Sequence, residues 1–586
     1  MEMIDAALLT VLLPLCGALF SLAAKIQHSE GRGRFLEWTG ALIGLFLPLG
    51  LLFVLLPQVR AGALVFAVGN RPSFLGIMQC FDGLAWLLDL LGFSALCIAW
   101  LYSRGAGPRG GLFTTLFLIQ ASALAAAASC TDLFNLFICF EVLGIASYAL
   151  VAISGKAKAL LASFSYLAVS SASMTFFLLG VYGLYRITGS LSYEGIYQAL
   201  SVLPGAGGTG ALLSLCCIIA ATMVRVAVFP LYGWLPDAHG AAPHAVSAVL
   251  SGVLLKTPLF ALGRFLIGFS APSFSAFPAA VLWEILGVAG VVTALIGVVF
   301  AVSQRDVKRL LAYHSVSQIG YVISAWALAS PEGLAAAWMH AFFHAIFKGL
   351  LFLSVGSAAD AGGSRNVYTL RNAAALLRKA GDRYNITAVS FMTAALSIAA
   401  VPPFSGYASK NGISYLFGSS RWQYWALALA GIGTMASMIK LSAVFFNAPV
   451  HGAPVRGQAN AEAGDTDASM AGEFRVRRSM KIAMGASALL CLVLGICAKP
   501  FGIFAAALCG AEKSPVPESL FSIPSIGNAL IYAAAAIGVY FFIMSRPGMN
   551  LSGKIRSLPR DFSYLMLAFP AALAALYFFV FLWRFF

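Results

Sequence analysis

Charged side chains inside long apolar segments constrain this chain more than any other feature. The 586-residue sequence is 60% hydrophobic and 10% charged. Charged or titratable residues nevertheless lie inside or at the edges of its apolar segments: Glu141, Arg225, Lys256, His340, His344, Lys348, Lys410 and Lys440. A charge at the bilayer centre costs about 2.5–3.5 kcal/mol on insertion scales. The pattern predicts a polytopic membrane protein with a buried hydrophilic track that moves protons or cations.

The apolar segments predict an all-α polytopic membrane protein with about sixteen transmembrane helices, since each span needs about 20 apolar residues. The predicted spans are 5–24, 37–57, 82–102, 112–129, 132–153, 160–187, 210–230, 243–268, 276–301, 310–330, 332–358, 385–401, 423–447, 482–504, 525–545 and 562–583. The first segment begins with acidic residues and has no small-residue cleavage site. We interpret it as a retained span rather than a signal peptide.

The formal net charge of +15 reflects topology rather than a nucleic-acid surface. Most loop Lys and Arg residues lie in the loops that follow odd-numbered spans: 25–36, 103–111, 154–159, 302–309, 359–384, 448–481 and 546–561. The positive-inside rule places these loops in the cytoplasm. Both termini are therefore predicted to lie outside.

The distribution of polar residues predicts four regions along the chain. Residues 1–80 form N-terminal spans, 81–447 the polar-containing core, 448–481 a flexible cytoplasmic connector and 482–586 the C-terminal spans. The connector is rich in Gly, Ala and Asp and ends in a basic cluster, a composition typical of a linker. No soluble domain is predicted.

The core shows a weak internal similarity between residues 112–268 and 276–447. Arg225 and Lys256 flank a proline-marked interruption in the first part, as Lys410 and Lys440 do near Pro402-Pro403 in the second. Interrupted segments at matching positions indicate an inverted-repeat transporter with broken helices.

The ten cysteines are interpreted as small apolar core residues. They show no CxxC or Cys/His ligand spacing, so no metal, iron–sulfur cluster or other cofactor is predicted on this chain.

Glu141, Arg225 and Lys256 are candidate transport residues. Glu141 lies ten residues into a span, and an intramembrane acid is functional by default; the alternative is a static, hydrogen-bonded glutamate. Arg225 stays charged, so it is predicted to pair with Glu141, unless it extends its charged end to the membrane interface. Lys256 lies in mid-span, where a buried lysine can cycle between charge states.

His340, His344 and Lys348 follow each other at four-residue spacing and are predicted to share one helix face. Histidine titrates near neutral pH, so the face is a candidate proton wire. The alternative is a metal site shared by the two imidazoles, for which no Cys or carboxylate ligand lies nearby in sequence.

Lys410 follows the second interruption and is a further candidate, although an ordinary boundary lysine would fit the same pattern. Lys440 fits a functional and a structural role about equally well. Polar residues in 305–321, including His314 and Gln318, could line a half-channel or make ordinary helix–helix hydrogen bonds.

Several stretches resemble the antiporter-like subunits of respiratory complex I, Mrp-type cation/proton antiporters, and membrane-bound [NiFe] hydrogenase and formate hydrogenlyase complexes. These stretches are FPLYGWLPDAHGAAPHAVSAVLSGVLLKT, RDVKRLLAYHSVSQIGYV, HAFFHAIFKGLLFLSVGS and PPFSGYASK. The resemblance covers roughly residues 80–447. It implies a core of two inverted five-helix repeats, location in a prokaryotic cytoplasmic membrane, and membership of a multi-subunit complex.

The resemblance also implies residue roles. Glu141 matches the glutamate of span five, and Lys256 matches the central lysine of span eight. His344 and Lys348, preceded by His340, match the polar ladder to the second half-channel, and Lys410 matches the lysine of broken span twelve. Arg225 stands where these proteins usually have a titratable lysine, which is a departure. Asn411 follows Lys410 where some complex I members carry an acid, and no long lateral helix is evident.

The resulting prediction is a proton-translocating subunit of a redox-driven complex, with a soluble arm of iron–sulfur or [NiFe] proteins as its expected partner. One alternative is a subunit of an Mrp-type antiporter without a redox partner. Sodium transport would need more acids near the track than Glu141, and Asp89 and Glu284 are the weaker candidates. The other alternative is a non-transporting scaffold for a soluble arm.

Overall fold

The computed structural model describes residues 3–27, 29–67, 77–203, 208–270, 279–447, 474–558 and 562–582. Its N-terminal elements are α1 (Met3–Ile26), α2 (Glu30–Ala41), the π-helical turn η1 (Leu42–Phe46), α3 (Leu47–Ala61), β1 (Leu64–Ala67) and β2 (Met78–Phe81). The strands β1 and β2 pair antiparallel. Most of the predicted connector, residues 448–473, lies outside the described residues.

The central and C-terminal elements are helical throughout. The central elements are α4 (Gly83–Ser103), α5 (Gly111–Ser129), α6 (Leu133–Ala152), α7 (Ala157–Thr188), α8 (Tyr193–Val202), α9 (Gly208–Val226), α10 (Trp234–Ala241), α11 (His244–Val249), the π-helical turn η4 (Leu250–Leu254), α12 (Thr257–Ile267), the 3-10 turn η5 (Gly268–Ser270), α13 (Ala279–Ser303), α14 (Val307–Trp326), α15 (Pro331–Gly362), α16 (Ala373–Lys379), α17 (Ile386–Ile398), α18 (Ser405–Phe417) and α19 (Trp422–Phe446). The C-terminal elements are α20 (Arg478–Ile496), α21 (Ala498–Leu508), α22 (Ile523–Met544), α23 (Arg546–Arg556) and α24 (Phe562–Leu582).

The predicted fold class is confirmed, because 13 helices of the described residues are long and apolar enough to cross a membrane. Three further predicted spans are also helices. The segment predicted at 385–401 is the short apolar helix α17, and the segment at 562–583 has its apolar stretch at Leu567–Leu582. The segment at 310–330 is α14, which is polar yet almost wholly buried. The chain is therefore an all-α polytopic membrane protein apart from the β1–β2 hairpin.

The predicted span 482–504 is divided in the structure. Helix α20 ends at Ile496 and α21 begins at Ala498, with Cys497 between them. Pro500 has no backbone N–H, so it cannot donate to the carbonyl of Ile496 four residues earlier. The apolar pattern predicts one continuous span here, because hydrophobicity alone does not reveal the missing hydrogen-bond donor of proline.

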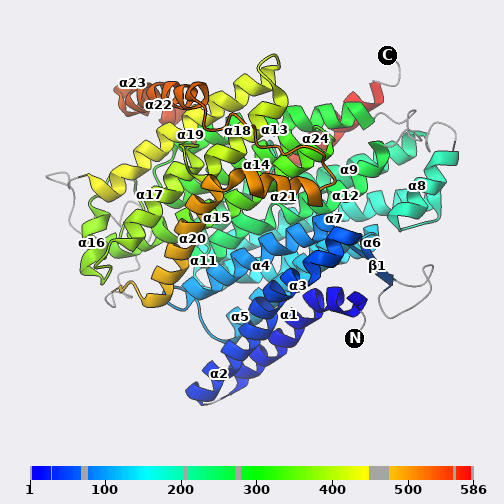
Figure 1. The fold of residues 1–586 in the computed structure, drawn as a ribbon, viewed down its shortest axis with the longest axis horizontal. Helices are drawn as coiled ribbons and strands as arrows, with labels where there is room; N and C mark the ends of the chain where they lie inside the picture. Colours follow the sequence, from blue (N-terminus) through cyan, green and yellow to red (C-terminus); the bar gives the residue numbers. More distant parts are fainter. Residues whose placement is uncertain are drawn as a thin grey trace.

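The loops after odd-numbered spans gather at one end of the bundle. Figure 1 shows α16 and α23, which lie in two of these loops, at the left of the molecule. Arg365 pairs with Asp306 at 3.4 Å, and Lys481 donates to the Gly381 carbonyl at 2.7 Å. Each contact joins two basic loops from different parts of the sequence.

The other loops gather at the opposite end, where Figure 1 shows α8 and β1 at the right. Arg264, near the end of α12, pairs with Asp82 before α4 at 2.7 Å. Gln79 forms an isolated β-bridge with Cys130. The alternation of loops read from the charge pattern therefore matches the arrangement of the helices.

Two helices of the core end in the same way, in the segments where the sequence predicts interruptions. Ala227 and Ala400 adopt left-handed backbone conformations, with φ of 59° and 57°. Val228 and Val401, the next residues, each donate their amide to a carbonyl five residues back at 3.1 and 3.0 Å. This hydrogen-bond pattern terminates a helix. A cis X–Pro bond follows in each segment. The broken helices of the predicted core are present.

Lys440 ties α19 to the end of α13. Its amine donates to the carbonyls of Val302 at 2.9 Å and Gln304 at 2.7 Å. Arg556 of α23 donates to the carbonyl of Ser303 between them at 2.5 Å. The last carbonyls of a helix have no intrahelical donors and carry partial negative charge. These cations cap α13, which gives Lys440 a structural role.

The Lys440→Met variant should therefore lose stability while keeping its transport activity. Leaving two buried carbonyls without their charged donor should lower the free energy of unfolding by about 1.5–3 kcal/mol. Thermal unfolding of the purified protein in detergent measures this, with the exposed Lys554→Met as the control. A Lys440→Met protein that unfolds like wild type would show that the cap contributes nothing.

Candidate functional site

Glu141 and Arg225 form an ion pair between α6 and α9. The Arg225 Nη2 atom lies 3.0 Å from the Glu141 Oε1 atom, and the guanidinium also lies 5.7 Å from the centre of the Phe140 ring. The Arg225 side chain is 4% exposed and the Glu141 side chain 29% exposed. The acid thus lies at the outer surface of the bundle, and the arginine holds it from inside.

Lys256 lies where the eighth predicted span is broken. The π-helical turn η4 precedes it, and α12 restarts directly after it with Pro258 in its first turn. Proline has no N–H to continue the hydrogen bonding of the preceding turn. The buried Lys256 amine donates to the free carbonyl of Ser251 and lies 2.7 Å from the Nδ1 atom of His344. The break therefore provides an acceptor for the amine in the middle of the membrane.

The predicted helix face of His340, His344 and Lys348 is present on α15, and all three side chains are completely buried. The two imidazole centres are 6.3 Å apart. The His340 Nδ1 atom lies 2.9 Å from the hydroxyl of Ser409 on α18. The two Nδ1 atoms thus face different partners, Lys256 and Ser409. No metal-binding group of three or more His, Cys, Asp or Glu residues occurs among the described residues.

Lys410 follows Ser409 and lies beside the second break. Its amine donates at 2.8 Å to the carbonyl of Ile398, the last residue of α17. The amine also lies 4.9 Å from the centre of the Tyr321 ring. Hydrogen bonds therefore join Lys256 to His344 and His340 to Ser409, the residue before Lys410, while the two imidazoles lie 6.3 Å apart.

Helix α14 supplies further polar groups to this set. The hydroxyls of Ser315 and Ser251 lie 2.7 Å apart, which joins α14 to the π-helical turn beside Lys256. The His314 Nε2 atom lies 2.8 Å from the Ser437 hydroxyl, an ordinary helix–helix contact. The amide of Gln318 is buried without a hydrogen-bond partner among the described side chains. The helix–helix hydrogen bond considered for this segment is thus present at His314, and lining of a half-channel stays a prediction.

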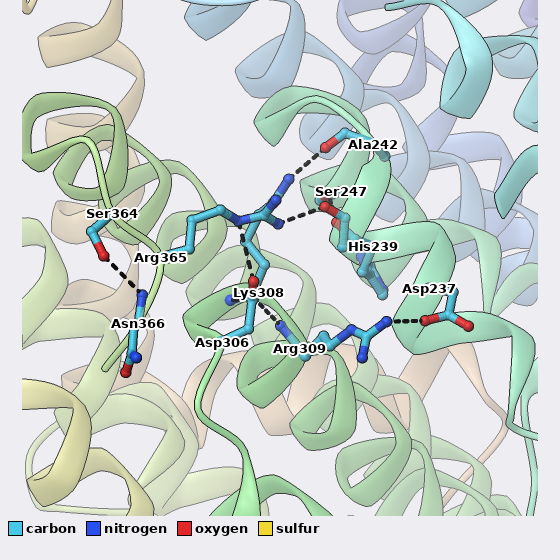
Figure 2. Close-up of polar contacts among 11 residues, drawn as sticks. Asp237, His239, Ala242, Ser247, Asp306, Lys308, Arg309, Ser364, Arg365 and Asn366 are labelled. Carbon is cyan, nitrogen blue, oxygen red and sulfur yellow. Dashed lines mark hydrogen bonds and ion pairs between the residues drawn. The ribbon is translucent and has the colours of Figure 1, made fainter. Parts of the chain in front are cut away.

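A polar cluster closes the end of the bundle where the basic loops meet, and Figure 2 shows it. Lys308 donates at 2.5 Å to the Ala242 carbonyl, and Arg365 donates at 2.5 Å to the Gly240 carbonyl. Arg309 pairs with Asp237 at 2.6 Å. These contacts hold the segment after α10 against the start of α14.

His239 lies within this cluster, and the sequence reasoning did not select it. Its ring is completely buried, and neither ring nitrogen has a hydrogen-bond partner among the described residues. The ring stacks on Phe352 with centres 4.7 Å apart, and the Lys348 amine lies 5.6 Å from the centre of the same Phe352 ring. A histidine in the proline-marked interruption of span seven was the available signal.

The Glu141–Arg225 pair stands apart from this track. In the described part of the chain, no hydrogen bond or ion pair links either residue to Lys256. The sequence-predicted residues thus form two groups: an ion pair at the bundle surface, and a buried set from Lys256 to Lys410.

Comparisons with known proteins agree on one family. Residues 130–439 match the family described as "NADH:quinone oxidoreductase/Mrp antiporter, TM". The chain is 34% identical over 357 residues to NADH-quinone oxidoreductase subunit N of Desulforudis audaxviator, covering 60% of this chain and 69% of that protein. It is 30% identical over 387 residues to a Na(+)/H(+) antiporter subunit of Alkalihalophilus pseudofirmus, covering 65% and 75%.

Further similarities extend to other complexes. The chain is 28% identical to Hydrogenase-4 component B of Escherichia coli, covering 64% of this chain and 56% of that protein. Its fold matches a chain of the Mrp complex from a Dietzia species with a TM-score of 0.74 and 24% identity, covering 91% of this chain and 100% of that one. A chain of an archaeal membrane-bound sulfane sulfur reductase matches with a TM-score of 0.73 and 23% identity, covering 90% and 99%.

The Arg225→Met variant should be less stable than wild type, because it leaves Glu141 without its cation. Breaking a buried pair costs about 3–5 kcal/mol, and the partial exposure of Glu141 should bring the loss below that range. Adding Glu141→Gln to Arg225→Met should restore part of the stability, as a double-mutant cycle of unfolding temperatures measures. Strictly additive effects would show that the two side chains do not interact.

Proposed function

Since the chain belongs to the NADH:quinone oxidoreductase/Mrp antiporter family of membrane subunits, we propose that it translocates protons within a redox-driven membrane complex. The observation that carries this proposal is the buried contact set from Lys256 through His344, His340 and Ser409 to Lys410. Buried amines and imidazoles without carboxylate partners can change protonation state without leaving a stranded counter-charge. A purely structural polar network would be expected to hold each cation in an ion pair.

The proposed unit of transport is the core, residues 81–447, built from the repeats 112–268 and 276–447. The matching helix ends at Ala227 and Ala400, with their matching backbone hydrogen bonds, support this division. The family match at 130–439 falls inside the core. Residues 1–80 and 482–586 would then flank the transporting part.

The first proposed step is electrostatic. Arg225 keeps its charge at ordinary pH, so the Glu141–Arg225 pair would respond by changing its separation or the protonation of Glu141. A change of charge near one end of the track alters the free energy of a proton on Lys256, since interactions between charges are strong in a low-dielectric interior.

The second step moves the proton along α15. The Lys256 amine and the His344 Nδ1 atom are in direct hydrogen-bond contact at 2.7 Å, so one proton can pass between them. The transfer leaves a neutral amine and an imidazolium. The Nε2 atoms of both histidines are buried without protein partners, and bridging water can connect such atoms. From His340 the proton would pass through Ser409 to Lys410.

Protons that enter from the end with the basic loops are proposed to pass His239 on their way to Lys348. His239 lies among the residues of Figure 2, and one face of its ring covers Phe352, next to Lys348. An imidazole in this position can accept a proton from the polar cluster and release it toward Lys348.

The proposed orientation puts the basic loops in the cytoplasm, with the chain in a prokaryotic cytoplasmic membrane and both termini outside. The positive-inside rule and the gathering of α16 and α23 at one end (Figure 1) support it. The end with α8 and β1 would face outward.

The proposed partners are other membrane subunits and a soluble arm with iron–sulfur or [NiFe] proteins. Relatives named as a quinone oxidoreductase subunit and a hydrogenase component favour redox coupling. A relative named as a Na(+)/H(+) antiporter subunit keeps the alternative of an antiporter without redox partners.

Purification from native membranes in mild detergent, with mass spectrometry of the co-purifying subunits, distinguishes a redox-driven complex from an antiporter without redox partners. Iron–sulfur or [NiFe] proteins are expected; cofactor-free partners alone would support the antiporter.

Replacing Lys256 by Met should abolish proton translocation in the assembled complex without preventing assembly, because the track loses its central proton carrier. Proton uptake into inverted membrane vesicles measures translocation, and co-purification of subunits measures assembly. Lys348→Met should also stop the flux. Lys440→Met serves as the control that removes a buried lysine outside the track. Undiminished flux in Lys256→Met would contradict the assignment, and undiminished flux in both would favour a scaffold.

A further inference from the structure

Asp89 is a buried acid that the proposed track does not use. It lies on α4, is 3% exposed, and its Oδ2 atom has no hydrogen-bond partner among the described residues. The other buried acids of the described residues have clear partners: Glu37 pairs with Arg104 at 2.6 Å, and Asp382 accepts the backbone N–H groups of Ile386 and Thr387 at 3.0 and 2.8 Å. Asp89 forms no ion pair among the described residues. An unpaired carboxylate is costly to bury, whereas the neutral acid is much less so.

The group next to Asp89 is a hydrogen-bond acceptor. The side chain of Thr10 on α1 lies against the Asp89 carboxyl. The Thr10 hydroxyl donates to the Ala7 carbonyl at 2.9 Å, so its own lone pairs remain available. A protonated carboxyl supplies a donor that this hydroxyl oxygen can accept.

The charged and titratable groups on the elements packed against α4 are engaged elsewhere or exposed. Helix α5 and the turn η4 carry no Asp, Glu, Lys, Arg or His residue. Arg60 of α3 lies over Phe504, and Lys348 of α15 lies over Phe352. The remaining groups are His244 with Asp360, Lys256 with His344, Lys481 with Gly381, Asp82 with Arg264, and the exposed Arg478 and Lys499. None of them forms an ion pair with Asp89.

Asp89 also lies close to the break that holds Lys256. One helical turn after Asp89, a Cβ atom placed on Gly92 would lie 3.9 Å from the Val253 side chain. Val253 accepts the backbone N–H of Lys256 at 2.9 Å. Asp89 is six residues from the start of α4, about 9 Å along the helix axis, and that start lies at the end of the molecule with β2. The segment from Val253 to α12 runs antiparallel to α4, because Arg264 near its end pairs with Asp82 at the start of α4. Asp89 and Lys256, each three residues from the Gly92–Val253 contact toward this end, therefore lie at about the same level.

We infer that Asp89 is a second proton-binding site, which takes up and releases a proton beside the break that holds Lys256. Binding converts the carboxylate to a carboxylic acid that donates to Thr10, and release returns the anion. No group of three or more His, Cys, Asp or Glu side chains that could hold a metal ion occurs among the described residues, and hard cations take about six oxygen ligands. The site therefore fits a proton. Its role in transport rests on the proposed function.

Infrared spectroscopy of the whole complex in lipid nanodiscs tests the proton site without any driving reaction. Isotope labelling of aspartate separates its carboxyl bands from those of glutamate. A carbonyl band of a protonated aspartate should be present at neutral pH, disappear at alkaline pH, and be absent in Asp89→Asn. The exposed Glu284→Gln should leave it unchanged. Absence of the band in wild type at every pH, or its loss on adding sodium at constant pH, would overturn the inference.

Proton uptake by membrane vesicles tests the role of Asp89 in transport. Asp89→Asn should assemble normally, because the amide resembles the neutral acid, and should slow proton uptake several-fold. If Lys256→Met stops uptake and Asp89→Asn leaves it unchanged, the proposed function stands and the role of Asp89 fails. If neither variant affects uptake, the proposed function itself fails, whatever the infrared result.

Discussion

Burying cations in an apolar bundle is the constraint on which the rest of this structure depends. A buried ammonium is costly unless it finds acceptors inside the protein, because the charge cannot reach water. Three buried lysines find them in main-chain carbonyls at helix ends and breaks, whereas the Lys348 amine lies over the Phe352 ring and has no hydrogen-bond partner among the described residues. Lys256 uses the carbonyl of Ser251, Lys410 that of Ile398, and Lys440 those at the end of α13. The broken helices are therefore the means by which lysines can be held at mid-membrane.

Carbonyl acceptors have a chemical consequence that carboxylate partners would not have. A carbonyl stabilises an ammonium but stays neutral when the proton leaves, so a lysine held this way can give up its proton at modest cost. In the Glu141–Arg225 pair, by contrast, each charge stabilises the other, so the loss of either charge leaves its partner uncompensated. The core thus combines one ion pair with the set of groups that are proposed to exchange protons.

The same kind of contact serves structure at Lys440 and, in the proposed function, transport at Lys256. Lys440 resembles Lys256 in sequence, as a lone lysine in an apolar segment, yet it bonds two carbonyls at the end of α13 and no titratable group. Lys256 bonds one carbonyl and the imidazole of His344. Local sequence could not separate these cases, because the difference lies in which helix end faces each amine. His239 was missed for a related reason: its burial and its stacking on Phe352 depend on a helix more than a hundred residues away.

Hydropathy, charge bias and prolines by themselves determined the all-α membrane fold, the alternation of loops and the interruptions near Pro230 and Pro402, but not the breaks at Lys256 and Cys497. These properties follow from the apolar composition of each segment and from the missing N–H of proline. The spacing of His340, His344 and Lys348 likewise determined that they share one helix face. Only the tertiary structure decided that this face meets Lys256 on one side and Ser409 on the other. It also decided that Arg225 reaches Glu141, because packing brings together groups that the sequence keeps far apart.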